Sequence, residues 1–253
     1  MQLFKKGRKI DFIVGGTQKG GTTALDYYLR RHPQIGMADR KELHFFDNER
    51  IFSKPKVRYS EYEKKFNFKS QKKIYGEATP IYFYWEPCCK RIWEYNPEIK
   101  LIFILRNPIS RAFSHWNMEF DRNYDSETFS NAIVNESERV KESLPLQHRV
   151  YSYIDRGLYF EQIKRYKSYF PDKQLLFIKY EEFKTEQEKT LFDIFKFLGV
   201  NPDEFTFEHK TIHEREKHSN ISNEDKKFLI SRFKNEIKKV EEILGWDCSD
   251  WLE

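Results

Sequence analysis

The sequence predicts an α/β fold: a P-loop-containing, doubly wound parallel sheet flanked by helices, in a single domain over residues 1–253. Three observations predict it. Apolar, β-prone runs alternate with helix-forming runs, as in parallel βαβ units. Residues 100–106 contain the uninterrupted apolar run LIFIL, which suits a strand covered on both faces. A glycine-rich loop within residues 12–25 joins an early apolar run to a helix. Ligands bind at the carboxyl ends of the strands in such folds, so we expect a site there.

The remaining elements follow from apolar periodicity and from the positions of proline and glycine. Asn107 and Pro108 suit the N-cap and the first position of a helix, and Gly199 and Gly245 each suit a helix end. We expect strands at residues 74–80 and 174–180, and helices at 24–31, 60–66, 85–95, from 108 onward, 159–170, 185–198 and 222–244.

Residues 117–153 are polar and contain a break at Pro145. The pattern predicts an irregular insert of more than ordinary loop length. Long inserts of this kind often close over a binding site, so we interpret this one as an acceptor-binding lid.

Composition limits the class of protein. The chain is 34% charged with a net charge of +5, a mild excess that suits an anionic ligand and is too dispersed for nucleic acid. No run approaches the roughly 18 apolar residues of a membrane span, and the first residues lack the apolar stretch of a signal peptide. Cys88, Cys89 and Cys248 form neither a disulfide framework nor a metal signature. We therefore expect reduced thiols in a cytoplasmic protein.

The early glycine-rich stretch, FIVGGTQKGGTTAL, is the strongest functional signal. Glycines let the backbone approach an anion, and the start of the helix presents free N–H groups; Thr22 and Thr23 suit its cap. In a Walker A loop a lysine follows the second glycine. Here Gly21 stands in that place and Lys19 lies two residues earlier. A nucleoside triphosphate with magnesium is therefore less favoured than another phosphate-like donor.

Residues 18–25, QKGGTTAL, resemble the 5′-phosphosulfate loop of sulfotransferases that use 3′-phosphoadenosine 5′-phosphosulfate (PAPS). Within that family, the loop is most similar to those of the heparan-sulfate sulfotransferases and their bacterial relatives. The resemblance implies that a short set of residues binds PAPS, the sulfuryl donor. It also implies in-line sulfuryl transfer, in which Lys19 stabilises the leaving oxygen. The set is Lys19, Gly20, Gly21, Thr22 and Thr23.

Residues 106–114, RNPISRAFS, match the pattern R-[ND]-P-x-x-R-x-x-S, which binds the donor 3′-phosphate in the resembled family. Arg106 at a strand end and Ser114 on the next helix can converge on one phosphate. The alternative is a structural ion pair and a solvent-facing serine. Family members also close this site with a late basic loop, for which Arg215 and Lys217 are candidates; a solvated basic loop is the alternative.

Residues 41–47, KELHFFD, resemble the family stretch K-E-x-H-F-F-D. A transferase to an alcohol or amine gains from a general base beside the acceptor. The resemblance implies that Glu42 is this base, with His44 and Asp47 as helpers in the acceptor pocket. The alternative is a solvated charged turn anchored by its two phenylalanines.

Residues 76–83 resemble a family loop on the acceptor side, which makes Glu77 and Tyr82 candidate substrate contacts; a plain strand-to-turn transition is the alternative. Ala78 stands where heparan 3-O-sulfotransferases carry a lysine, a departure that weighs against a heparan-type acidic acceptor. Phe46, Tyr82 and Trp116 are the aromatic side chains expected to stack on a sugar or aromatic acceptor.

Together these features predict a PAPS-dependent sulfotransferase that needs no metal, releases 3′-phosphoadenosine 5′-phosphate (PAP), and acts on a hydroxyl or amine of a carbohydrate or small metabolite. We expect no nucleic-acid partner and no membrane span, and the sequence leaves the oligomeric state open. Two alternatives remain: a P-loop kinase of small molecules, and a non-catalytic module that binds anionic glycans.

Overall fold

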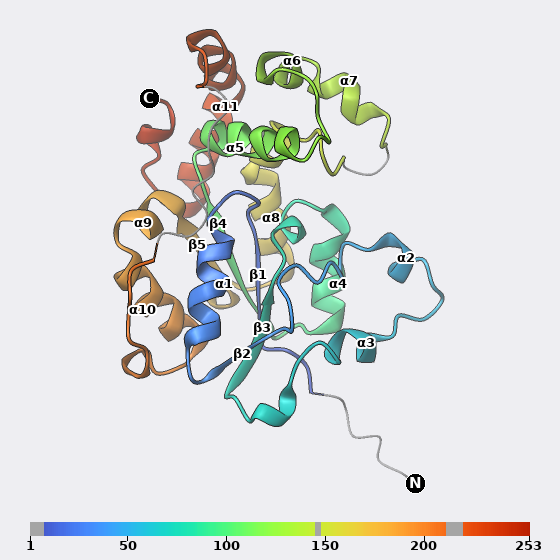
Figure 1. Ribbon diagram of the computed structural model, residues 1–253, viewed down its shortest axis with the longest axis vertical. Helices are drawn as coiled ribbons and strands as arrows, with labels where there is room; N and C mark the ends of the chain where they lie inside the picture. The colour runs from blue at the N-terminus through green and yellow to red at the C-terminus, as the bar shows by residue number, and fades with distance from the viewer. Residues whose placement is uncertain (1–7, 145–147, 211–219) are drawn as a thin grey trace.

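The computed structural model describes residues 8–144, 148–210 and 220–253. Within these ranges five parallel strands form one sheet in the order β2-β3-β1-β4-β5 (Figure 1). The strands are β1 (Phe12–Gly16), β2 (Ile35–Met37), β3 (Ile74–Ala78), β4 (Lys100–Leu105) and β5 (Leu175–Lys179). The strand order reverses between β1 and β4, which is where doubly wound folds bind ligands. The predicted fold class is confirmed.

Helices cover both faces of this sheet. The longer ones are α1 (Thr22–Arg31), α4 (Glu86–Tyr95), α5 (Pro108–Asp121), α8 (Tyr159–Tyr169), α10 (Gln187–Leu198) and α11 (Asn223–Leu244). The shorter ones are α2 (Glu49–Phe52), α3 (Tyr59–Glu63), α6 (Phe129–Val134), α7 (Glu136–Lys141) and α9 (Tyr180–Thr185). Short 3₁₀ turns join several of them, including one at Asp155–Gly157.

Alternate residues of the central strands enter two separate cores, because successive side chains of a strand point to opposite faces. Val14 and Ile102 belong to a cluster with apolar residues of α1 and α10, whereas Ile13 and Phe103 belong to one that includes apolar residues of α4 and α8. Both faces of β1 and β4 are therefore buried, as the uninterrupted apolar runs predicted.

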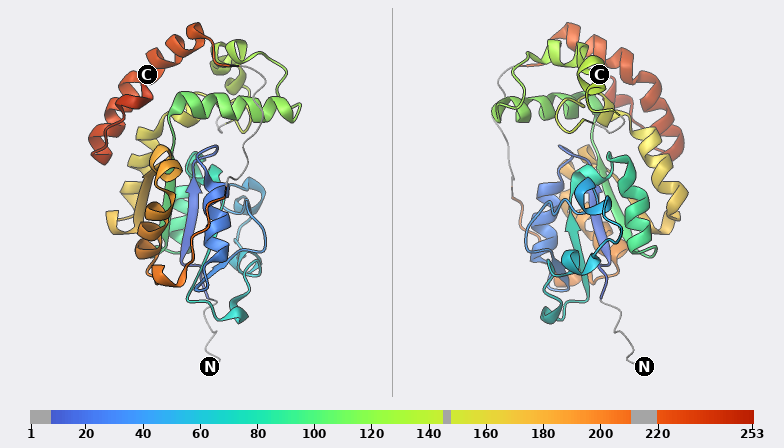
Figure 2. Two further views of the ribbon diagram at one scale, coloured as in Figure 1. Left: turned by 60° about the vertical axis from the view of Figure 1, so that its left-hand side comes forward. Right: turned by 90° about the vertical axis from the view of Figure 1, so that its right-hand side faces the viewer.

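The helices α5, α6 and α11 form an upper layer beyond the carboxyl ends of the strands, as both views of Figure 2 show. Asn107 caps α5 by accepting hydrogen bonds from the backbone N–H groups of Ile109 and Ser110, at 2.9 and 3.3 Å. Gly199 and Gly245 end their helices with φ angles of 80° and 68°. These predicted boundaries are confirmed.

Residues 117–153 are not the irregular segment that the sequence predicts. The helix α5 runs on to Asp121, and α6 and α7 follow it. The reason is packing: Trp116 and Phe129 lie 5.5 Å apart between ring centroids in one apolar cluster, which stabilises short helices whose sequences are polar overall. The strand β2, which is three residues long, was not predicted from the sequence.

The helix α1 is capped by backbone geometry. Its N-cap is Gly21, with a φ of 89°, and no described side chain bonds to this end. Thr22 and Thr23 are the first helical residues, so the prediction that they cap the helix is wrong. The three cysteines are free and buried, which fits the expected reduced thiols.

Candidate active site

The loop between β1 and α1 is tied tightly to β4. The backbone N–H and the hydroxyl of Thr17 both donate to the carbonyl oxygen of Ile104, at 3.0 and 2.8 Å, and Gly20 N–H donates to Thr17 O at 2.9 Å. A Cβ atom on Gly20 would lie 2.5 Å from Ile104 O, so only glycine fits there. Lys19 has a left-handed φ of 68°. The predicted loop is thus a narrow, fixed turn at a strand end.

The N-terminus of α1, which directly follows this loop, presents backbone N–H groups that make no hydrogen bond within the helix. The first helical hydrogen bonds come from the N–H groups of Ala24 and Leu25, which both donate to Gly21 O. In the part of the chain that the structure describes, no side chain caps this end and no carboxylate lies in its first turn. The N–H groups of the first turn and the positive end of the helix dipole therefore suit an anion such as a phosphosulfate.

Arg106 brings a second cation to this loop. Its Nη1 donates to the backbone oxygen of Lys19 at 3.2 Å, and its guanidinium lies 4.8 Å from the centre of the Tyr180 ring. Ser114 is half-buried on α5, about two turns beyond Arg106. Their joint role toward a 3′-phosphate stays a prediction. The two late candidates, Arg215 and Lys217, lie outside the described residues.

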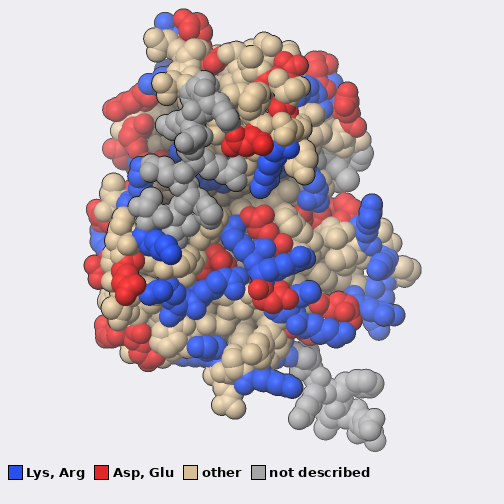
Figure 3. Space-filling view, viewed as in Figure 1, with Lys and Arg blue, Asp and Glu red and all other residues tan. Residues whose placement is uncertain are grey.

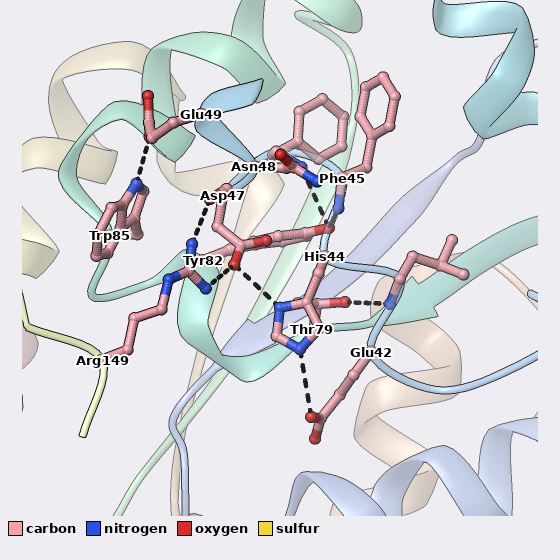
Figure 4. Close-up of polar contacts among 12 residues, drawn as sticks. Glu42, His44, Phe45, Asp47, Asn48, Glu49, Thr79, Tyr82, Trp85 and Arg149 are labelled. Atoms are coloured by element: carbon pink, nitrogen blue, oxygen red, sulfur yellow. Dashed lines mark hydrogen bonds and ion pairs between the residues drawn. The ribbon is translucent and has the colours of Figure 1, made fainter. Parts of the chain in front are cut away.

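Glu42, His44 and Asp47 form a connected network (Figure 4). His44 Nδ1 and Asp47 Oδ2 are hydrogen-bonded at 3.0 Å, and His44 Nε2 lies 3.6 Å from Glu42 Oε2. The ammonium of Lys41 contacts the other oxygen of Glu42 at 2.6 Å. The structure therefore brings together the three residues predicted for the acceptor side.

These contacts fix the charges of the network. The hydrogen bond that the His44 ring donates to Asp47, together with its contact with the Glu42 carboxylate, raises the pKa of His44 to about 9. The hydrogen bond from His44 is the main reason that the pKa of Glu42 falls to about 2, with Lys41 adding to it. Burial alone would raise the pKa of Asp47, but His44 and Arg149 more than offset it and lower that pKa. At neutral pH the network is an imidazolium between two carboxylates.

Glu42 and His44 both have left-handed backbones, with φ angles of 62° and 52°. Such angles are strained for residues other than glycine and persist only where the surroundings enforce them. Here the N–H of Glu42 donates to Ala78 O at 2.9 Å, and the N–H of Leu43 donates to Thr79 Oγ1 at 3.0 Å. The end of β3 therefore holds Glu42 in its place.

A cavity of about 410 Å³ opens beside this network. Arg149 lies at its wall: Nη1 donates to Asp47 Oδ2 at 2.7 Å, Nη2 donates to Asp47 O at 2.6 Å, and the guanidinium lies 4.6 Å from the centre of the Trp85 ring (Figure 4). The cavity is lined by His44, Asp47, Asn48, Glu49, Arg50, Trp85 and Arg149. A volume of this size suits a small molecule or a sugar unit.

One face of the molecule is rich in cations. Figure 3 shows Lys and Arg side chains gathered across its middle, below the upper helices, with acidic groups among them. A surface of this kind attracts anionic ligands without selecting one.

The comparison with known families decides between the open alternatives at the level of the family. A model of the sulfotransferase domain matches residues 9–241, which is most of the chain. The chain belongs to the sulfotransferase domain family. The resemblance drawn from the phosphate loop is therefore confirmed.

Relatives of this sulfotransferase domain are found among curated and solved proteins. It is 24% identical to the membrane-associated sulfotransferase kil1 of Dictyostelium discoideum, over 94% of this chain and 65% of that protein. It is 30% identical to mouse heparan sulfate glucosamine 3-O-sulfotransferase 5, over 75% of this chain and 53% of that protein. The chain thus spans about half to two thirds of these relatives. A crystal structure of a sulfotransferase from Alicyclobacillus acidocaldarius superposes with a TM-score of 0.82 and 25% identity, over 97% of this chain and all of the other.

Two predicted acceptor contacts of this sulfotransferase domain are internal instead. Glu77 and Tyr82 are 0% exposed. The Glu77 carboxylate accepts hydrogen bonds from the hydroxyls of Tyr62, Thr79 and Tyr82, at 2.7, 2.5 and 3.1 Å. Tyr82 OH in turn accepts from the N–H of Phe45 at 3.0 Å. The pair supports the stretch that carries Glu42 and His44, and the prediction of direct acceptor contact is wrong.

The aromatic residues predicted to stack on the acceptor are also buried. Trp116 is 4% exposed, packs against Phe113 and Phe129, and donates from Nε1 to Glu127 O at 2.9 Å. Phe46 has no exposed surface. The aromatic side chain that does line the cavity is Trp85, which the sequence did not single out.

Metal binding and membrane insertion each have a structural requirement. Among the described residues, no group of three or more His, Cys, Asp or Glu side chains is arranged to hold a metal ion. No described helix has the length and apolar character that crossing a bilayer requires. The cytoplasmic location stays a prediction.

Proposed function

We propose that this sulfotransferase domain moves the sulfuryl group of PAPS to a hydroxyl or amine of an acceptor, a carbohydrate or a small metabolite. The observation that carries the proposal is the meeting of an uncapped helix start, Lys19 and Arg106 at the carboxyl ends of β1 and β4. An anion held there would lie at the crevice where the strand order reverses.

On the donor side, the N–H groups of residues 21–23 and the ammonium of Lys19 hold the phosphosulfate, while the N–H of Gly20 keeps the loop in shape by donating to Thr17 O. Charge develops on the bridging oxygen as the bond to sulfur breaks, and Lys19 stabilises that charge. Arg106 and Ser114 select the donor through its 3′-phosphate. The mechanism assigns no role to a metal ion.

On the acceptor side, Glu42 accepts the proton of the attacking hydroxyl or amine. A pKa near 2 makes it a weak base, but keeps it ionised, which is the state that a base needs. In a loose transition state the new bond forms late, so the proton becomes acidic late and a weak base suffices. Asp47 holds the imidazolium of His44, and His44 orients Glu42.

Two measurements test the proposal. PAP should raise the melting temperature of the protein, whereas ATP with magnesium should not, since Gly21 stands where a kinase loop has its lysine. A screen of sugars and small metabolites with ³⁵S-labelled PAPS should then yield a labelled product. Stabilisation by ATP with magnesium alone would favour the kinase. Polyanion binding that survives Lys19→Ala, with no PAPS turnover, would favour the glycan-binding module.

Arg106→Ala should chiefly weaken donor binding. The loss of a charged hydrogen bond to a phosphate predicts a fall in PAP affinity of about ten-fold or more, measured by calorimetry. Arg232→Ala, an exposed arginine on α11, is the matched control and should bind PAP like the wild type. An unchanged PAP affinity in Arg106→Ala would remove Arg106 from the site.

A further inference from the structure

One segment contacts both halves of the site. We call residues 148–156 the strut segment; it lies between α7 and α8 in the chain and includes the last residues of the insert. Near its start, Arg149 binds Asp47 on the acceptor side. At its end, Arg156 is 3% exposed and donates to Oε1 of Gln18, in the phosphate loop. Asp47 and Gln18 belong to different loops, so the strut segment bridges them.

The guanidinium of Arg156 is bonded on several sides. Besides Gln18, it donates from Nε to Ser152 Oγ at 2.8 Å and from Nη2 to the carbonyl oxygen of Arg149 at 2.5 Å. Its face lies 4.7 Å from the centre of the Tyr84 ring. A planar fork of donors can serve three acceptors at fixed angles, which a lysine cannot do. Arg156 therefore ties the backbone at Arg149 to the phosphate loop.

The earlier part of the insert holds the strut segment in turn. The carboxylate of Glu136, at the start of α7, accepts from the backbone N–H groups of Ile154 and Asp155, at 2.6 and 2.8 Å. The hydroxyl of Tyr153 donates to Asp125 Oδ2 at 2.6 Å. These bonds satisfy buried groups and fix the segment against α7 and the end of α5. The helices of the insert thus have a structural task near the site.

Further contacts connect Arg149 to Glu42, the proposed base. Arg149 and His44 share one oxygen of Asp47, at 2.7 and 3.0 Å, and His44 lies 3.6 Å from Glu42. Asp47 has 0% exposure, so its position is set by the groups that hold it. A shift of Arg149 would pass through Asp47 to the imidazole that orients Glu42.

We propose that Arg156 and Arg149 are positioning residues that fix the separation between the donor loop and the acceptor-side base. This inference rests on the proposed function, because in-line transfer needs Lys19 and Glu42 to address one sulfuryl group. Misplacement of reacting groups by about 1 Å can cost about 100-fold in rate, so a rigid link between the two loops has a use. Neither arginine takes part in a bond that forms or breaks.

Two variants separate a geometric role from a long-range effect of charge. Arg156→Lys keeps the positive charge and loses the fork of hydrogen bonds. Arg122→Gln removes a positive charge from the end of α5 and leaves the strut segment untouched. PAP affinity is measured by calorimetry, and the titration midpoint of the His44 ring is measured by NMR.

Arg156→Lys should weaken PAP binding about ten-fold, because Gln18 loses a charged hydrogen-bond partner. It should also move the midpoint of His44 upward, because a loosened Arg149 leaves more of the Asp47 oxygen to the imidazole. The other charged groups around His44, Glu42 and Lys41, are unaltered. Arg122→Gln should leave both quantities at their wild-type values.

Gln18→Ala completes the test. It should weaken PAP binding as Arg156→Lys does. The double variant should bind PAP no less tightly than the single variant with the lower affinity, because both substitutions break the same contact. If Arg156→Lys does not fold, Gln18→Ala must still move the His44 midpoint for the proposal to stand. Wild-type PAP affinity and His44 midpoint in the folded variants, or equal effects of Arg122→Gln, would overturn it. Failure of the wild type to bind PAP would instead overturn the proposed function.

Discussion

The two halves of the site are built in different ways. On the donor side, the ends of two neighbouring strands form the site: the loop after β1 is tied to Ile104, the start of α1 presents its N–H groups, and Arg106 directly follows β4. The geometry there is mostly backbone geometry. Such a site is rigid before any ligand arrives, because the strands on either side of the crevice fix it.

The acceptor side depends on side chains from distant segments. Asp47 and Arg149 are 102 residues apart and meet through two hydrogen bonds. Glu42 and His44 keep left-handed backbones only because the buried end of β3 and Tyr82 hold their stretch. The difference teaches that donor binding should tolerate changes on the acceptor side, whereas transfer should be sensitive to both sides.

Lys19→Ala should have the largest effect. The loss of one preorganised charge at the leaving oxygen predicts a fall in transfer rate of at least about 100-fold, to the background level. The rate is measured with labelled PAPS and the best acceptor from the screen. Lys164→Ala, an exposed lysine on α8, is the matched control and should keep full activity. Transfer at the wild-type rate without Lys19 would remove it from the mechanism.

Glu42→Gln should have the next largest effect, and it should lower the transfer rate without changing donor binding. The loss of a general base predicts a fall in kcat of about 100-fold or more. PAP affinity should stay within about two-fold, because the donor side is built from other residues. Glu61→Gln, on an exposed face of α3, controls for the loss of a carboxylate. A large loss of PAP affinity in Glu42→Gln would show that the halves are not separate.

The same difference between local and long-range contacts explains how much of each half could be predicted from the sequence. The donor loop, Arg106 and the stretch of Glu42 and His44 are each encoded in a few adjacent residues, so the sequence alone could single them out, and their roles stay predictions. The partnership of Arg149 with Asp47 carries no local signal.

The burial of three predicted acceptor contacts also could not be predicted from the sequence. Glu77, Tyr82 and Trp116 have side chains that could contact a sugar as well as an internal partner, and only the packing of β3, α3, α5 and α6 places them inside. The helices of the insert were missed for the same reason, since tertiary contacts stabilise them more than their own composition does.

The smallest effect should be on stability against pH. His44 has a folded pKa of about 9, above its usual 6.5, so its stabilising contribution is full below pH 6.5 and is lost as the pH rises through about 9. The melting temperature of the wild type should fall across that window. His44→Asn should lack this part of the fall, and His209→Asn, an exposed histidine, should keep it. Parallel curves for all three proteins would contradict the assigned pKa.

The most direct test of the account is a crystal structure with PAP. We expect the 5′-phosphate on the backbone N–H groups of residues 21–23 beside the ammonium of Lys19, with the 3′-phosphate at Arg106 and Ser114. A nucleotide bound elsewhere on the protein, or no nucleotide at this loop under saturating PAP, would contradict the account.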